Sequence, residues 1–176
     1  MTRHYTVTLD SASIRKMIER LELLKSRLQI ASENIAKRLA DIGYDHATVN
    51  FADAEYDGTN DADIQLDPIP NGYRLSANGQ SIMFIEFGTG ITKGNGYPGT
   101  KPPEIAPIGT YGLGQGAKGK WVYNGNPGTN GVVINTKNNA VLTRGNRPNA
   151  CMFNAGQTMH DAIIQIVKEE MAHAYA

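Results

Sequence analysis

The acidic residues between positions 53 and 63 are the first candidates for chemistry, because carboxylates alternating around a glycine are typical of calcium loops. These acidic residues are Asp53, Glu55, Asp57, Asp61 and Asp63, with Gly58 between them. A loop of the EF-hand type needs Asp or Asn at alternate positions and a closing glutamate. Glu55 breaks that alternation, and no glutamate lies six residues beyond Gly58. We therefore expect solvated turns here and no metal site.

Two glycine motifs have the spacing of nucleotide-binding loops. Residues 94–99 and 114–119 both fit G-x-G-x-x-G, and residues 114–120 also fit G-x-x-x-x-G-K. A dinucleotide loop must open a helix after a parallel strand, but Pro98 interrupts the first motif and a strand-like run follows the second. Trp121 also stands where a phosphate-binding loop needs a hydroxyl for Mg²⁺. The sequence therefore predicts no cofactor.

A catalytic group is equally hard to assemble from the titratable side chains. The four histidines lack the spacing of a zinc-binding helix, and no G-x-S-x-G elbow is present. The single cysteine, Cys151, excludes an internal disulfide and is interpreted as a small apolar residue at a helix start, with a reactive thiol as the alternative. We expect no catalytic residues, which favours a structural or binding protein.

The length of 176 residues suits one domain that buries its own core. Basic and acidic residues both number 17, so the net charge indicates neither a nucleic-acid nor a membrane partner. We find no apolar run long enough to span a membrane and no leader peptide, so we expect synthesis in the cytoplasm.

Two helices are predicted, one near each end of the chain. After cap-forming Asp10, an apolar stripe predicts a helix of about 30 residues that stops at Gly43. The stripe either packs on the chain's own sheet and C-terminal helix or forms a coiled-coil seam with another subunit, because its spacing is near 3.5 residues. Its members are Ile14, Met17, Leu21, Leu24, Leu28, Ala31, Ile35, Leu39 and Ile42. A second apolar face predicts a helix over residues 151–176.

Short strands are predicted between the helices, at residues 47–51, 64–66, 73–77 and 82–87, with a further one at residues 5–9. Asn-Gly pairs on either side of residues 73–77 indicate hairpin turns. The fold class is therefore α+β, with both helices packed on an antiparallel sheet of about four to five strands. Residues 44–87 carry eight acidic side chains and one basic one, a net charge of −7.

Residues 88–150 differ sharply from the rest of the chain. They hold 14 of the 19 glycines and six of the eight prolines, and seven bases against one acid give a net charge of +6. A segment of this length with little apolar periodicity indicates a functional loop. We interpret it as an extended arm with one hairpin, formed by residues 120–124 and 131–135, between a body at residues 1–87 and the C-terminal helix.

The order of these elements, together with the motif Phe84-Ile85-Glu86-Phe87-Gly88-Thr89-Gly90, resembles the tail-completion and head-to-tail joining proteins of long-tailed bacteriophages. In that family an Ile/Val-Glu-Phe/Tyr-Gly-Thr motif ends a strand, which matches residues 85–89. Tyr97-Pro98 matches a His-Pro element only at the proline. Residues 150–155 match the motif that opens the family's C-terminal helix only at Met152 and Ala155.

The resemblance implies a virion protein of the tail or neck that assembles in the host cytoplasm as a ring, often of six copies. Its partners would be the tail tube and the head connector, with transient DNA contact in the channel. The opposite charges of the arm and body suit a contact between neighbouring copies. The expected interface residues are Phe87, Gly88, Thr89, Gly90, Lys93, Lys101, Lys118, Lys120, Trp121 and Tyr123, with residues 88–90 as a hinge. The alternatives are a hydrolase under a glycine-rich lid and a monomeric binding module.

Overall fold

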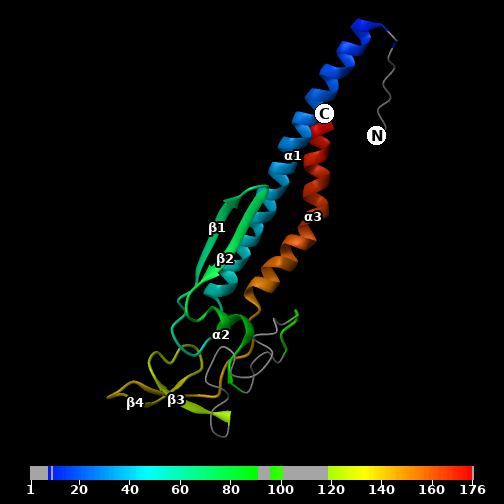
Figure 1. Cartoon of the computed structure of the whole chain (residues 1–176). Helices are drawn as coiled ribbons and strands as arrows, with labels where there is room; N and C mark the ends of the chain where they lie inside the picture. The colour runs from blue at the N-terminus through cyan, green and yellow to red at the C-terminus, as the bar shows by residue number, and fades with distance from the viewer. Residues whose placement is uncertain (1–7, 9, 91–95, 101–118, 176) are drawn as a thin grey trace.

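The computed structural model describes residues 8, 10–90, 96–100 and 119–175. Two long helices lie side by side, a β-hairpin lies along the longer one, and a small sheet with loops sits at one end of the pair (Figure 1). The α+β class is confirmed, but the five described strands form two separate sheets and not one. The strand predicted at residues 5–9 lies outside the described residues, apart from Thr8.

Helix α1 (Ser11–Ala52) is longer than the sequence pattern predicted. Asp10 caps it as expected, because its side chain accepts hydrogen bonds from the backbone N–H groups of Ala12 and Ser13. The predicted stop at Gly43 is wrong, since the helix continues for nine more residues. A Cβ on Gly43 would lie 2.5 Å from the Met159 Sδ atom. Gly43 therefore serves close packing and not helix termination.

The strand predicted at residues 47–51 is the last part of α1. Ala47 and Phe51 are fully buried, and with Ala40 and Gly43 they recur at gaps of three or four. The sequence pattern did not reveal this helical spacing, because alanine and glycine are only weakly hydrophobic. Phe51 packs with Ile85 and Cys151 in the buried core.

Helix α3 (Cys151–Tyr175) runs antiparallel to α1 and confirms the predicted C-terminal helix. The α3 side chains that face α1 are mostly small, so the two backbones approach closely. Ala155 is fully buried, and Ile166 and Ala174 are nearly so.

A hairpin of β1 (Asp63–Ile69) and β2 (Gly72–Asn78) covers another side of α1. The strands at residues 64–66 and 73–77 are confirmed, and Asn71 adopts φ +67° in the turn that its Asn-Gly pair predicted. The strand predicted at residues 82–87 is instead the short helix α2 (Ile82–Phe87). Three consecutive residues of α2, from Ile85 to Phe87, are buried. Tertiary contacts on all sides of this segment therefore override the strand preference of its apolar residues.

The second sheet consists of β3 (Trp121–Asn124), β4 (Val132–Asn135) and β5 (Ala140–Thr143). Both predicted strands exist, but they do not pair with each other as a hairpin. β5 lies between them and pairs antiparallel with each, so the order is β3-β5-β4. β5 was missed although it is the buried centre of the sheet, with Val141 fully buried.

Candidate assembly interface

Residues 84–90, the motif that resembles the phage tail-completion proteins, lie at a buried junction between α2, α3 and the start of the arm. Residues 85–90 are all buried. Glu86, which belongs to the run predicted as a strand at residues 82–87, accepts hydrogen bonds from the Met152 and Phe153 backbone N–H groups at 2.9 and 3.2 Å. These N–H groups belong to the first turn of α3, which has no intrahelical acceptor for them. The Glu86 carboxylate therefore caps a helix that begins 65 residues later in the chain.

Tyr97 holds the arm against this junction. Its hydroxyl donates to the Glu86 carboxylate at 3.0 Å, and its ring centroid lies 4.7 Å from that of Phe87 and 5.9 Å from that of Phe153. Burial and the neighbouring Glu86 charge raise the pKa of Tyr97, so its proton stays in place to donate. The partial match at Tyr97-Pro98 thus marks an attachment point, which sequence reasoning did not identify.

The predicted hinge at residues 88–90 is tied to the segment that leads into α3. The Thr89 N–H donates to the Asn146 carbonyl and the Asn146 N–H donates to the Thr89 hydroxyl, both at 2.8 Å. Gly88 and Gly90 adopt φ +77° and +62°, which side chains disfavour. The two glycines therefore let residues 88–90 pack closely against the segment around Asn146. We call this contact the crossing.

A buried carboxylate connects this crossing to the small sheet. Asp57 accepts hydrogen bonds from the Thr143 hydroxyl and the Asn130 N–H, while its own N–H donates to the Asn146 side chain at 2.9 Å. Asp57 belonged to the rejected calcium pattern, and no group of three or more metal-ligating side chains occurs within the described part of the chain. Its role in the structure is to hold together segments far apart in sequence.

The predicted interface residues divide into three groups. Lys93, Lys101 and Lys118 lie outside the described residues, as do the two glycine motifs except for residues 96–99 and 119–120. Phe87 to Gly90 are buried within the chain, and the half-buried Trp121 ring lies against Gly90. Lys120 is exposed, and the Tyr123 hydroxyl donates to the Asn126 carbonyl at 2.6 Å. Phe87 and Trp121 are thus already engaged internally, and their role between subunits stays a prediction.

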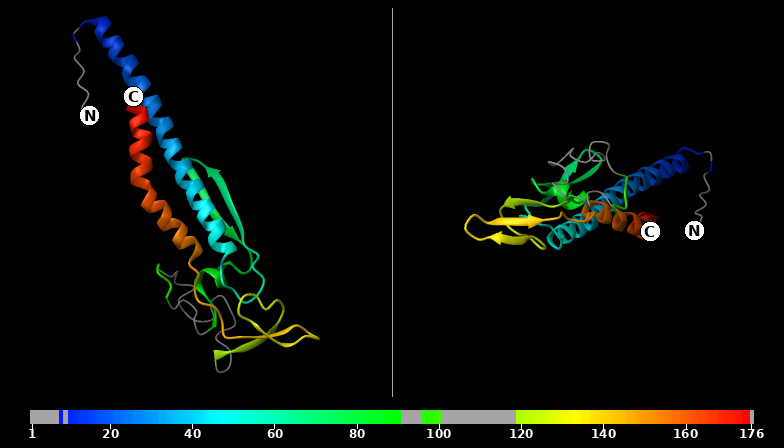
Figure 2. Two further views of the ribbon diagram at one scale, coloured as in Figure 1. Left: turned by 180° about the vertical axis from the view of Figure 1, so that it is seen from behind. Right: turned by 90° about the horizontal axis from the view of Figure 1, so that it is seen from below.

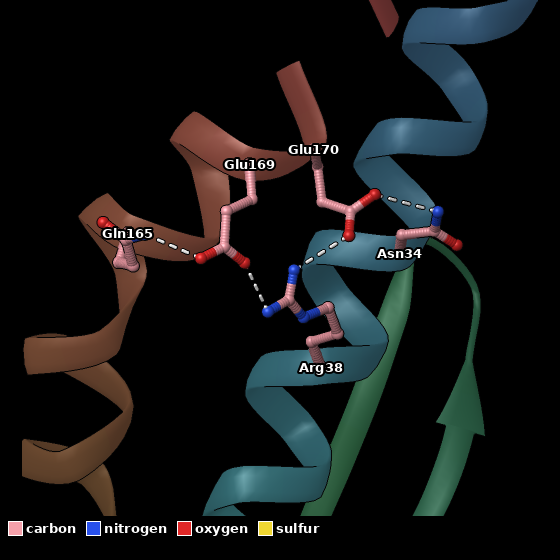
Figure 3. A network of polar contacts seen from close by, with 5 residues as sticks. All are labelled: Asn34, Arg38, Gln165, Glu169 and Glu170. Carbon is pink, nitrogen blue, oxygen red and sulfur yellow. Dashed lines mark hydrogen bonds and ion pairs between the residues drawn. The ribbon is translucent and has the colours of Figure 1, made fainter. Parts of the chain in front are cut away.

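A network of hydrogen bonds and ion pairs joins α1 to α3 (Figure 3). The Arg38 guanidinium spans Glu169 at 2.7 Å and Glu170 at 2.9 Å, while Asn34 donates to Glu170 and Gln165 to Glu169. Hydrogen bonding from Arg38 lowers the pKa of Glu169, and bonds from Asn34 and Arg38 lower that of Glu170. An open groove beyond this network, bordered by Ile30 and Ala174, marks where α3 ends along α1.

Past the C-terminal end of α3, no other described helix or strand lies beside α1, as both views of Figure 2 show. We call residues 11–26 the α1 overhang, which is about 24 Å long at 1.5 Å per residue. Ile14, Ile18 and Leu21 are all more than 40% exposed. The apolar stripe that packs inside the molecule at Ile35, Leu39 and Ile42 therefore reaches solvent here. This surface is the strongest candidate interface in the described structure.

A second apolar surface lies on the side of α3 turned away from α1. Ile164, Val167, Met171 and Tyr175 recur at gaps of three or four, opposite the buried Ile166 and Glu170. We call these four residues the α3 outer stripe. Ile164 is 65% exposed, the most of any large apolar residue described. Helix α3 is thus apolar on two faces, of which only one is covered.

The single cysteine, Cys151, is the remaining candidate for chemistry. Cys151 is buried in the core, which raises the pKa of its thiol to about 12 and disfavours the reactive thiolate.

Comparisons with protein-family models, with curated proteins and with solved structures found no match to this chain. None of the helices in the described ranges is both long and apolar enough to cross a membrane.

Proposed function

We propose that the chain is a structural subunit that assembles with copies of itself into a ring, as do the phage tail-completion and head-to-tail joining proteins that it resembles. The observation that carries this proposal is the α1 overhang, a helix segment whose large apolar side chains face solvent. Burying such a stripe against another subunit removes apolar area from water, at roughly 25 cal/mol per Å².

The motif that resembles the family supports the same proposal. Ile85 fills the core, Glu86 caps α3 and Thr89 bonds to the segment before it. Each of these residues has a structural task, as expected of a motif that preserves a scaffold. In the virion the ring would join the tail tube to the head connector.

Oligomeric state tests the proposal directly. Sedimentation velocity over a range of micromolar concentrations should give a single large species, and electron microscopy of that species should show closed rings. A chain that stays monomeric throughout this range would contradict the proposal and favour a stand-alone binding module.

The proposed transient partner is DNA, because exposed basic side chains near the small sheet can contact its phosphates. Residues 119–150 carry four basic side chains and no acidic one: Lys120, Lys137, Arg144 and Arg147. Binding of duplex DNA should weaken steeply as salt rises, because released counterions drive it. No binding at low salt would contradict a DNA contact without affecting the proposed ring.

A further inference from the structure

One face of the small sheet is apolar and open to solvent in the described structure. In the register of the sheet, Val122 lies beside Leu142 and Leu142 beside Val132, so these side chains share one face. Val122 is 51% exposed and Val132 is 58% exposed. Val141 and Thr143 belong to the opposite face and are buried. The sheet therefore packs inward through one face and leaves an apolar row on the other.

Two basic side chains flank this row. Lys120 precedes Val122 by two residues, Arg144 follows Leu142 by two, and both are exposed. Because side chains of an extended chain alternate between faces at about 3.3 Å per residue, both project from the face of the row, roughly 7 Å from it. We call this surface the sheet outer face, which consists of Lys120, Val122, Val132, Leu142 and Arg144. Its apolar centre indicates a protein partner, because DNA phosphates would contact only the lysine and the arginine.

A surface of opposite charge lies at the C-terminal end of α1. Val49 is 56% exposed, and Asp45 and Asp53 are exposed four residues before and after it. Residues four apart are neighbours on one side of a helix, about 6 Å from each other. We call Asp45, Val49 and Asp53 the α1 acidic row. The surrounding residues 39–73 carry eight acidic side chains and no lysine or arginine.

The sheet outer face and the α1 acidic row are complementary. Each has an apolar centre with charged side chains about 6–7 Å away, and the two sets of charges have opposite sign. Two sheet outer faces would bring like charges together, as would two acidic rows. Both surfaces lie toward the same end of the molecule (Figure 1), yet both are exposed, so neither covers the other within one chain. A second copy of the chain therefore offers each surface its complement.

We infer that the sheet outer face of one subunit packs on the α1 acidic row of the next subunit. The two surfaces are different, so the contact is head-to-tail, and its repetition closes into a ring when the rotation between copies permits. This inference rests on the proposed self-assembly and specifies one contact in it, separate from the α1 overhang. Lys137 and Arg147 lie outside the contact and stay available to DNA.

Charge reversal followed by mixing tests the contact. The first full-length variant carries Lys120→Glu and Arg144→Glu, so that both of its surfaces are acidic. The second carries Asp45→Lys and Asp53→Lys, so that both of its surfaces are basic. Each variant alone should associate at least about 100-fold more weakly than the native chain, because like charges then face each other. An equimolar mixture should regain association, since each surface again meets the opposite charge on the other variant.

Matched controls carry the same charge changes elsewhere in the chain. Lys137→Glu with Arg147→Glu reverses two exposed basic side chains outside the sheet outer face. Asp63→Lys with Asp67→Lys reverses two exposed acidic side chains of β1. Both controls should associate as the native chain does. Sedimentation velocity measures association, and circular dichroism verifies that each variant is folded.

Crosslinking gives a second measurement, which does not depend on charge. Full-length chains carrying Val49→Cys are mixed with chains carrying Val132→Cys and treated with a short bismaleimide, and the expected product is a crosslinked dimer. Val133→Cys is the matched control, because Val133 is 45% exposed but lies on the opposite face, beside Val141. The buried native Cys151 does not compete for the reagent. Equal dimer yields from the Val132 and Val133 chains would overturn the inference.

The outcomes separate this inference from the proposed function. If the native chain associates and the mixture of reversed variants behaves no differently from either variant alone, the contact is wrong and the ring proposal stands. If the first variant loses DNA binding but associates as the native chain does, the sheet outer face is a DNA surface and the inference fails. If the native chain stays monomeric, both fail. Weak association of each variant that mixing restores, with the controls intact, supports both.

Discussion

The two parts of α1 differ in what covers them, although one apolar stripe runs through both. From Ala31 onwards the buried residues are mostly small, namely Ala31, Ala40, Gly43 and Ala47, because α3 and the β1–β2 hairpin approach closely. The overhang instead carries Ile14, Ile18 and Leu21, which project into solvent. The first part therefore serves folding of one chain, and the second suits association between chains. This contrast predicts that substitutions in the two parts affect different measurements.

The largest loss of stability is expected where the folded body depends on a single side chain. Glu86→Ala removes the acceptor for two α3 N–H groups and for the Tyr97 hydroxyl. We expect the free energy of unfolding to fall by about 2–4 kcal/mol, because a cap is lost and buried donors are left without acceptors. Denaturant titration measures this change. Glu55→Ala, at an exposed side chain, is the control, and equal losses for the two variants would contradict the capping role.

Two helix glycines give the next test, because they have opposite surroundings. A Cβ at Gly43 would lie 2.5 Å from Met159 and 3.3 Å from Leu75, whereas one at Gly156 would meet nothing within 4 Å. Gly156→Ala should stabilise the protein by about 0.5–1 kcal/mol, the gain in helix propensity. Gly43→Ala gains the same helix propensity but must displace the end of the Met159 side chain, so we expect it to be less stable than Gly156→Ala by about 1 kcal/mol. Thermal unfolding of the two variants measures the difference, and equal stabilisation by both would show that the Met159 side chain moves aside without cost.

A smaller effect is expected at the network that closes the covered part of α1. Because Arg38 lowers the pKa of Glu169 and Glu170, its stabilisation is present above the carboxylate pKa of the unfolded chain, near 4.5, and is lost as the pH falls through the lower folded values. Arg38→Met should therefore be less stable than the native chain at neutral pH, and the difference should close in acid. Unfolding curves across this pH range measure it. A difference that persists in acid would mean that Arg38 acts through packing alone.

The smallest effect on folding is expected in the overhang. Leu21→Glu should change the unfolding free energy of the isolated subunit by less than about 0.5 kcal/mol, because the Leu21 side chain is 54% exposed. Thermal unfolding at concentrations low enough to keep the chain monomeric provides the measurement. A clear destabilisation of the monomer would remove the contrast between the two parts of α1.

Sequence patterns predicted those elements whose apolar residues are large and regularly spaced. The first 30 residues of α1, the C-terminal helix and both strands of the β1–β2 hairpin were found in this way. The end of α1 was missed because its buried face consists of Ala47 and Phe51 beyond a glycine that usually ends a helix. α2 was assigned as a strand because a short apolar run has no period that distinguishes the two.

By itself, then, the sequence determined the α+β class, the two helices and the apolar stripe that runs along α1. Only the tertiary structure decided which part of that stripe is covered, because this depends on where α3 ends and not on the stripe. It also decided the role of Glu86, whose partners on α3 lie more than 60 residues away along the chain. Local spacing reports which face of an element is apolar, whereas the neighbour of that face is set by the path of the whole chain.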